Sequence, residues 1–196
     1  GIFYHPDLAF SFPVPAGYQV INQPTQVGMV EPDNKAILLF SIAGEATSAR
    51  DEASKLTAGE GIQTVDSGPA TVNGNPAYFV LADAQTDDGE VRLLSYYIEY
   101  GGQVYTFLGF ASKASFSTYR NTLERSMRGF DRVTDRRILN IEPSRLRVVT
   151  ASRSGAFRSF LPNNMPEQFT PEGLAILNQV ELDTRIERGQ KIKLPR

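Results

Sequence analysis

Apolar and polar residues alternate with a period of two through the middle of the chain, in residues 91–100 and 103–111. In the first segment one face carries Arg92, Leu94, Tyr96, Ile98 and Tyr100, and in the second it carries Val104, Thr106, Leu108 and Phe110. This period is typical of β-strands. Turn sequences precede and separate the two segments, at residues 86–89 and 101–102, so the pattern predicts antiparallel strands in a meander.

Further strands are expected around this meander, over residues 26–30, 63–67 and 77–82. Residues 36–43 form the longest apolar run, and its length favours a central strand buried on both sides. Asn73-Gly74 is a strong hairpin signal. Phe10–Pro15 is expected to be extended, with its prolines confining it to a sheet edge or to the start of a strand.

Two helices are predicted in the same part of the chain. Thr47 or Ser48 can cap a helix over residues 49–56. Ser115 can cap a helix over residues 116–127, where Phe116, Tyr119, Leu123 and Met127 form one apolar stripe. Residues 1–133 are therefore predicted as an α+β domain, a twisted and mainly antiparallel sheet with two packed helices.

The last third of the chain has a different pattern. Residues 134–143 are charged and are predicted as a linker, and residues 144–196 as a small β-α-α-β domain. Its strands are expected at residues 145–150 and 191–194. Its first helix is expected at residues 156–161, stopped by Pro162, and its second runs from Pro171 to about Asn178 with Thr170 as its cap.

Composition limits the classes of function. The chain has 196 residues, 41% of them apolar, which is enough for a real core. A net charge of −2 favours neither nucleic acid nor anionic lipid as a partner. The chain has no cysteine, which excludes disulfides and thiolate metal sites, and no apolar stretch long enough to span a bilayer. Gly1 reads as a tag remnant, so we expect a fragment of a longer protein.

The C-terminal segment is similar to LysM modules, which are β-α-α-β binders of peptidoglycan or chitin. Leu177-Asn178 matches the end of their second helix, and Arg188–Pro195 matches their closing Pro-Gly-Gln-x-Leu-x-Ile-Pro strand, with Arg188 in place of the first proline. The Gly-Asp-Thr that follows their first strand corresponds to Ser154-Gly155-Ala156, which departs from it. The resemblance implies a degenerate LysM-like domain.

The order of the two parts resembles a second group. A Phe-x-Phe-Pro segment (Phe10–Pro13) leads an α+β domain, which ends in the helix at residues 116–127 and precedes the LysM-like tail. This order is similar to the non-catalytic C-terminal region of bacterial cell-envelope zinc metallopeptidases related to the CAAX prenyl protease and HtpX. The resemblance implies an upstream catalytic domain with a zinc-binding HExxH motif.

The chain itself cannot hold that zinc site. A zinc peptidase of this type needs two histidines one helical turn apart, a third ligand and a glutamate base. The only histidine here is His5, in a segment expected to be frayed and exposed. We therefore expect no catalytic residue, cofactor or metal in this chain, with zinc in the missing catalytic domain.

An interaction surface is the remaining candidate site. Tyrosines are dense on two neighbouring strands, where they would either pack in the core or present a binding surface. The LysM-like tail adds the residues that match its family motif. The candidate surface comprises Tyr96, Tyr100, Tyr105, Asn178, Gly189, Gln190 and Lys191.

Two charged groups are interpreted as solvated. Asp83, Asp87, Asp88 and Glu90 surround a hairpin loop too short for a calcium site. Arg132, Arg136 and Arg137 form a basic stretch at the linker, for which docking of a partner is the weaker alternative.

The leading hypothesis is an accessory region of a periplasmic or cell-envelope zinc metallopeptidase that positions substrate or partners. Its partners would be the upstream catalytic domain and a protein substrate or peptidoglycan. The alternatives are a free-standing peptidoglycan-binding module and a small-molecule or lipid carrier. The carrier would need an apolar cavity between the 116–127 helix and the sheet.

Overall fold

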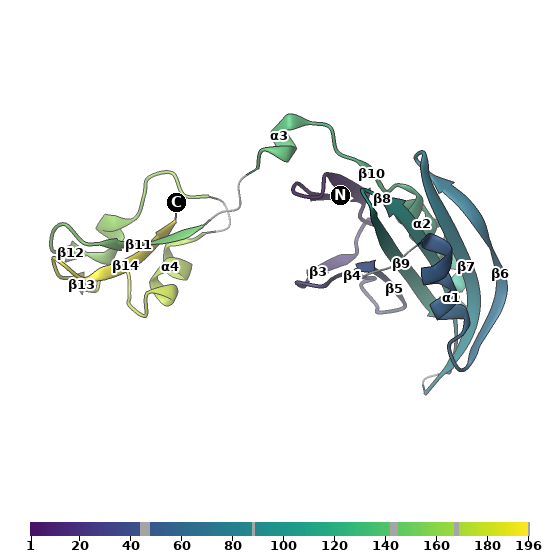
Figure 1. The fold of residues 1–196 in the computed structure, drawn as a ribbon. Coiled ribbons are helices and arrows are strands. Elements are labelled where there is room, and N and C mark those ends of the chain that lie inside the picture. Colours follow the sequence, from purple (N-terminus) through teal and green to yellow (C-terminus); the bar gives the residue numbers. More distant parts are fainter. Residues whose placement is uncertain (44–47, 88, 142–144, 167–168, 196) are drawn as a thin grey trace. The chain divides into compact units, whose positions relative to one another are not determined.

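The chain forms two compact units, Gly1–Asn140 (unit 1) and Ile141–Arg196 (unit 2). The computed structural model describes residues 1–43, 48–87, 89–141, 145–166 and 169–195 (Figure 1). The division falls within the predicted linker, residues 134–143. That segment contains a short helix, α3 (Arg136–Leu139), whose N-cap Asp135 accepts a hydrogen bond from the Arg137 amide. Residues 142 and 143 of the predicted linker lie outside the described residues.

Unit 1 is built on a seven-stranded sheet in the order β3-β4-β5-β9-β8-β7-β6, with every neighbouring pair antiparallel. The predicted α+β class, a large antiparallel sheet with few helices, is confirmed. At the Asn73-Gly74 turn both residues have positive φ, as a two-residue hairpin loop requires. The strands are β3 (Gln19–Asn22), β4 (Gln26–Val30), β5 (Ala36–Ala43), β6 (Ile62–Val72), β7 (Asn75–Thr86), β8 (Gly89–Tyr100) and β9 (Gln103–Ser112).

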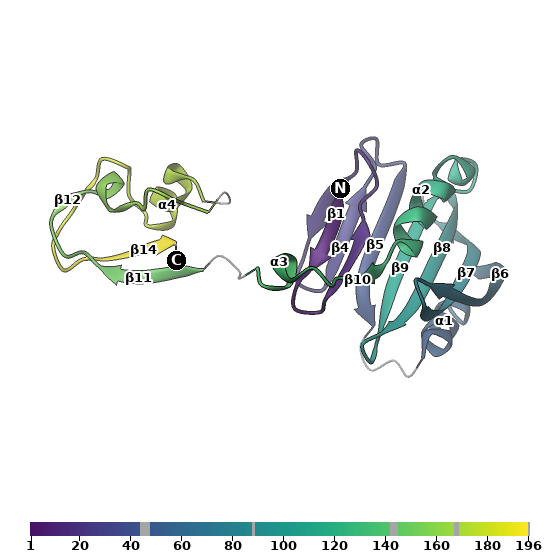
Figure 2. The same ribbon diagram turned by 90° about the horizontal axis from the view of Figure 1, so that it is seen from above.

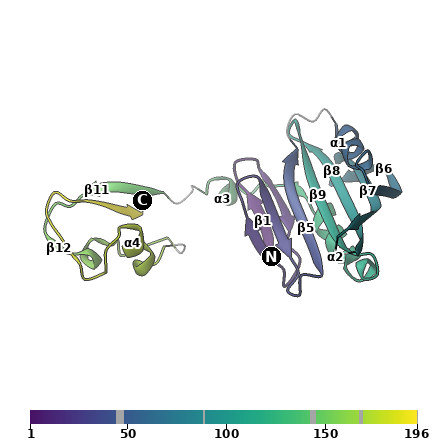
Figure 3. The same ribbon diagram turned by 90° about the horizontal axis from the view of Figure 1, so that it is seen from below.

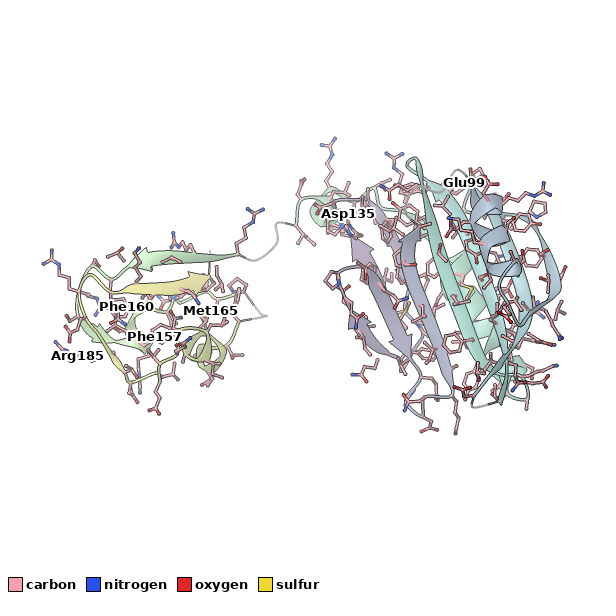
Figure 4. All side chains as sticks on the ribbon, turned by 60° about the horizontal axis from the view of Figure 1, so that its bottom comes forward. Glu99, Asp135, Phe157, Phe160, Met165 and Arg185 are labelled. Carbon is pink, nitrogen blue, oxygen red and sulfur yellow. The ribbon has the colours of Figure 1, made fainter. Side chains whose placement is uncertain are left out.

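Helices α1 (Ala49–Thr57) and α2 (Phe116–Arg128) pack on opposite faces of this sheet (Figure 2). Ser48 caps α1 by accepting a hydrogen bond from the Asp51 amide, and the alternative cap, Thr47, lies outside the described residues. Glu99 on β8 also accepts a hydrogen bond from the first amide of α1, that of Ala49, at 2.7 Å (Figure 4). Ser115 precedes α2 as predicted, but its hydroxyl bonds to Ser112 and does not cap the helix.

A second, three-stranded sheet lies on the α2 side, in the order β1-β2-β10. Its strands are β1 (Ile2–His5), β2 (Phe10–Pro13) and β10 (Asp131–Arg132). The prediction that the proline-rich segment lies at an edge or a strand start was wrong. β2 is the central strand and Pro13 is its last residue, so the proline interrupts no pairing between strands. The N-terminus is likewise a strand and not frayed.

The two sheets meet through a layer of buried rings, here called the aromatic layer, in which Phe12 lies 4.7 Å from Phe40 and 5.1 Å from Phe107 between ring centroids. The Tyr100 hydroxyl adds a hydrogen bond of 2.9 Å to the Ala9 carbonyl, which ties the β1–β2 loop to the seven-stranded sheet. The aromatic layer comprises Phe10, Phe12, Phe40, Tyr105, Phe107 and Phe130.

Helix α2 packs directly on β9, with Leu123 and Met127 fully buried. Gly109 makes this approach possible, because a Cβ there would lie 2.7 Å from Met127 Cε and 3.2 Å from Leu123 Cδ1. The interface that the carrier hypothesis needs as a cavity is therefore filled with side chains.

Unit 2 pairs β11 (Leu146–Thr150) with β14 (Lys191–Pro195), and β12 (Gly155–Ala156) with β13 (Arg185–Ile186). Helix α4 (Pro171–Leu177) begins as predicted, with the Thr170 hydroxyl accepting from the Gly173 amide. The core of unit 2 comprises Ala151, Phe157, Leu174, Ala175, Ile186, Ile192 and Leu194.

The predicted helix at residues 156–161 is only a 3₁₀ turn, η1 (Phe157–Phe160). The amides of Phe157 and Arg158 donate to the Thr184 and Leu182 carbonyls, so this backbone is paired with a distant segment and not within a helix. Six residues before a proline are also too few to sustain an α-helix on their own.

None of the described helices is long and apolar enough to cross a membrane.

Replacing Gly109 with alanine should lower the free energy of unfolding by about 1–3 kcal/mol, because the new methyl group displaces the Met127 and Leu123 side chains from their packing on β9. Gly28→Ala is the matched control, since its Cβ would have no neighbour closer than 3.8 Å. Urea denaturation of both variants measures the difference. Equal stabilities for the two variants would contradict the close packing.

Candidate functional site

The tyrosines predicted as a surface belong mainly to the core of unit 1. Tyr96 and Tyr105 are 5% and 2% exposed, which corrects the prediction that they form part of a binding surface. The Tyr96 hydroxyl donates to Glu124 Oε1 at 3.0 Å, and burial is the main cause that raises its pKa to about 12. Tyr100 is half-buried. Alternation placed Tyr96 and Tyr100 on one face correctly, but α2 and β2 cover that face.

The candidate residue Asn178 of unit 2 is engaged within the fold. Its Nδ2 donates to the Leu174 and Lys193 carbonyls, both at 2.8 Å, and its Oδ1 accepts from the Lys193 amide at 2.6 Å. The side chain therefore pairs with β14 as a neighbouring strand would, and both of its donor hydrogens are used. This is a structural role, because no Asn178 donor remains for a ligand.

Gly189 and Gln190 form the turn before β14. Gly189 has φ of +92°, and the Gln190 amide donates to the Glu187 carbonyl at 3.0 Å, which makes a β-turn with its positive φ at the third position. The Gln190 side chain accepts from the Glu187 amide at 3.1 Å. Of the four candidates in unit 2, Lys191 alone is charged, and its exposed side chain has no ion pair among the described residues.

A cleft of about 490 Å³ lies in unit 1, between β1 and the edge of the seven-stranded sheet. Residues 3–6 form one wall, and the β3–β4 turn, residues 22–27, forms the other. The strand registers place Asn22, Val27, Phe40 and Ile42 on one face of the sheet, the face that β1 partly covers (Figure 3). These four residues form the floor of the cleft.

The lining of the cleft is uncharged and rich in hydrogen-bonding groups. Among the described residues that line it, none is Lys, Arg, Asp or Glu. Several polar side chains line it, and none of them has a hydrogen-bond partner in the described part of the chain. With apolar Phe3, Phe40 and Ile42 beside them, they can bind an uncharged ligand that combines amide or hydroxyl groups with apolar ones. The polar side chains are those of Tyr4, Asn22, Gln23 and Thr25. Gln26 and Ser41 also line the cleft, but the strand register places their side chains on the opposite face of the sheet.

His5 contributes the imidazole ring of this cleft. It is half-buried, which differs from the exposed position expected of it, and its ring lies 5.2 Å from that of Phe10. Its Nδ1 accepts a hydrogen bond from the Leu8 amide at 3.3 Å, so Nε2 is the nitrogen left for a ligand. Within the described ranges, no group of three or more His, Cys, Asp or Glu side chains could hold a metal ion.

Asp83 is the member of the predicted acidic loop that the structure buries, and it is not solvated as expected. Arg92 holds its two oxygens at 2.6 and 2.9 Å, and Lys113 lies 3.1 Å away. The hydrogen bonds from Arg92 are the main cause that lowers its pKa to about 2. Asp88 lies outside the described residues. Of the three linker arginines, Arg132 and Arg136 are exposed and Arg137 pairs with Asp135.

Comparisons with known proteins identify the fold of the chain. No protein-family model and no curated protein matches the sequence. The solution structure of cyanobacterial PsbP (CyanoP) from Synechocystis sp. PCC 6803 is similar, with 12% identity and a TM-score of 0.55, over 67% of this chain and 91% of that one.

Two crystal structures are also similar. LpqN, involved in cell envelope biogenesis of Mycobacterium tuberculosis, has 14% identity and a TM-score of 0.50, over 62% of this chain and 81% of that one. A protein from Bacteroides thetaiotaomicron VPI-5482 has 13% identity and a TM-score of 0.51, over 74% of this chain and 52% of that one. At these identities the similarity extends to the fold alone.

The cleft was missed by the sequence reasoning. Its floor combines strands β3, β4 and β5, and its outer wall is β1, which the sequence analysis did not predict as a strand. The one local signal was the unpatterned polar turn of residues 22–26, where amide side chains follow one another without a capping role. That signal marks a turn and does not reveal what lies opposite.

Asn178→Ala should destabilise unit 2 by about 1–3 kcal/mol, because the exchange removes three hydrogen bonds and leaves the Lys193 backbone unpaired. Asn164→Ala, at an exposed position, is the control. Hydrogen exchange of the β11 and β14 amides in the full chain measures the effect. Unchanged protection in Asn178→Ala would show that the side chain is not structural.

The free energy of unfolding should fall at low pH, because protonation of Asp83 removes its ion pairs. Its pKa is about 2 in the fold against 3.8 as the ordinary value, so the carboxylate stabilises the fold above about pH 4, and this contribution is lost as pH falls through 2. We expect it to be about 1–2 kcal/mol, since solvent partly screens Arg92 and Lys113. Asp83→Asn should therefore be less stable than wild type at pH 7, with the gap narrowing below pH 3.

Urea denaturation at pH 7 and below pH 3 measures the difference in stability between wild type and Asp83→Asn. Asp66→Asn, an exposed carboxylate with no ion pair among the described residues, should show no such gap at either pH. A gap for Asp83→Asn that is independent of pH would contradict the ion-pair argument.

Proposed function

We propose that the chain is a non-catalytic accessory region of a bacterial zinc metallopeptidase, which positions a protein substrate or partner for a catalytic domain elsewhere in the same protein. The observation that carries the proposal is the uncharged cleft of unit 1. Its free amide and hydroxyl groups beside an apolar floor match an extended peptide, which presents backbone N–H and C=O groups and apolar side chains together.

The order of the two units, an α+β domain followed by a small C-terminal domain, supports the proposal that the parent protein is a zinc metallopeptidase. Unit 2 has the Leu177-Asn178 pair and the Gly189-Gln190 turn of a LysM-like module, and Asn178 joins α4 to β14 within it. The zinc would be bound by the catalytic domain, since this chain has one histidine and an HExxH site needs two. The involvement of LpqN in cell envelope biogenesis supports a periplasmic or envelope location.

Peptidoglycan binding by unit 2 is the second candidate, favoured by the same module-like order. The support for this candidate is weaker, because the side-chain amide of Asn178 and the side-chain oxygen Oε1 of Gln190 already form hydrogen bonds within the fold. The packing of Leu123 and Met127 under α2 does not favour the carrier alternative. Sedimentation with purified peptidoglycan separates the first two candidates, since peptide positioning by unit 1 predicts no pelleting.

Binding of labelled unstructured peptides tests the cleft. Uncharged peptides with apolar residues should bind more tightly than matched acidic or basic ones. The double variant Asn22→Ala with Ile42→Ala should weaken binding about tenfold, because one hydrogen bond and one apolar contact are lost. Fluorescence anisotropy measures the affinities.

The matched control is Gln19→Ala with Ile21→Ala, which removes similar groups from the opposite face of β3. Equal affinities for the two double variants would reject the cleft as the site. Zinc-dependent proteolysis by this chain alone would reject the non-catalytic role. The absence of an HExxH motif in the reading frame that encodes the parent protein would reject the metallopeptidase assignment.

A further inference from the structure

The two units carry charge of opposite sign. Residues 141–196 hold nine Lys and Arg against six Asp and Glu, a net charge of +3, whereas residues 1–140 hold eleven against sixteen, a net charge of −5. The net charge of −2 for the whole chain conceals this difference. The sequence argument against an anionic partner therefore does not apply to unit 2 by itself.

In the described part of unit 2, one face of the β11–β14 sheet is bare. Helix α4 and the η1 turn lie on the other side of the sheet, with the core of the unit between (Figures 2 and 3). The register pairs Val148 with Lys193 and Thr150 with Lys191, so these residues share the bare face with Leu146. We call this set of five residues the basic–apolar face.

The basic–apolar face exposes aliphatic side chains that a small domain would normally bury. Val148 is 64% exposed and Leu146 is 40% exposed. The end of α4 adjoins this face, because Lys193 Nζ donates to the Leu177 carbonyl at 3.4 Å. That end of the helix adds Ile176 and Leu177, which are 76% and 42% exposed.

The cations of this region lack counter-charges. In the part of unit 2 that the structure describes, no carboxylate pairs with Lys191 or Lys193, nor with the flanking Arg145, Arg147 and Arg188. By contrast, Arg158 and Arg185 pair with Asp183 and Glu187. Within the described ranges of unit 2, Arg158 and Arg185 are therefore neutralised by carboxylates, whereas the cations around the basic–apolar face have no carboxylate partner.

We propose that the basic–apolar face docks on the surface of an anionic phospholipid bilayer. Unpaired lysines attract the headgroups, and the exposed aliphatic side chains enter the boundary between headgroups and acyl chains. A soluble polyanion, such as a nucleic acid, would satisfy the lysines but leave Leu146, Val148 and Ile176 in water. A bilayer accepts both kinds of side chain. The proposal does not depend on the function proposed for unit 1.

Co-sedimentation of the full chain with vesicles tests the proposal. Vesicles of phosphatidylcholine with one quarter phosphatidylglycerol should bind the chain, and binding should weaken as salt rises. Pure phosphatidylcholine vesicles should bind it at least about tenfold more weakly. Lys191→Glu with Lys193→Glu should reduce binding at least about twentyfold, since each lysine near an anionic surface contributes about fivefold.

The matched control is Arg132→Glu with Arg136→Glu, which makes the same change of net charge at exposed positions of unit 1. The control should bind as wild type does. Equal loss in both double variants would reject a local face in favour of a net-charge effect. Equal binding of the wild type to both kinds of vesicle would reject the role of anionic lipid.

The apolar contribution has its own test. Val148→Thr with Leu177→Gln should weaken vesicle binding about threefold to tenfold at constant charge. Val20→Thr with Val65→Thr changes two similarly exposed residues of unit 1 and should have no effect. If inorganic polyphosphate competes fully with the vesicles and Val148→Thr with Leu177→Gln changes nothing, the face binds polyanions and not a membrane.

Discussion

The packing of aromatic rings between the two sheets of unit 1 is the interaction on which the rest of that unit depends. Phe10 and Phe12 reach this layer from β2, Phe40 and Phe107 from the large sheet, and Phe130 from the segment after α2. Buried ring pairs contribute both apolar area and preferred geometry. Because the rings come from segments far apart in the sequence, one layer fixes the N-terminal strands, the sheet and the end of α2 together.

The cleft is a consequence of that layer. β1 is held over β4 and β5 by its pairing with β2. The aromatic layer fills the space between β1 and the large sheet up to Phe40. Along β5 the floor passes from Phe40 to Ile42, which is exposed, as is Asn22 on β3. A binding site at the margin of a rigid core needs little reordering when a ligand enters, which lowers the entropic cost of binding.

Unit 2 is smaller and is built around a sheet of only two strands, β11 and β14. Its two-stranded sheet has one face on the core and one bare face, and the Asn178 amide pairs with the free edge of β14. The Asn178 side chain occupies the Lys193 backbone groups that another strand would need, which protects this edge of β14 from edge-to-edge association. The bare face keeps its lysines without a carboxylate partner among the described residues, and their like charges discourage association between copies of the chain.

Local chemistry in the sequence determined most of the elements: the period-2 strands, the Asn73-Gly74 hairpin, the caps at Ser48 and Thr170, and the α+β class. Tertiary structure decided what covers each face. Alternation placed Tyr96 and Tyr100 of β8 on one face, but only the packing of α2 and β2 shows that Tyr96, and Tyr105 on β9, are buried. The η1 turn, the burial of Asp83 and the cleft of unit 1 depend on residues distant in the sequence, and alternation along one strand carries no information about a partner that is not its neighbour.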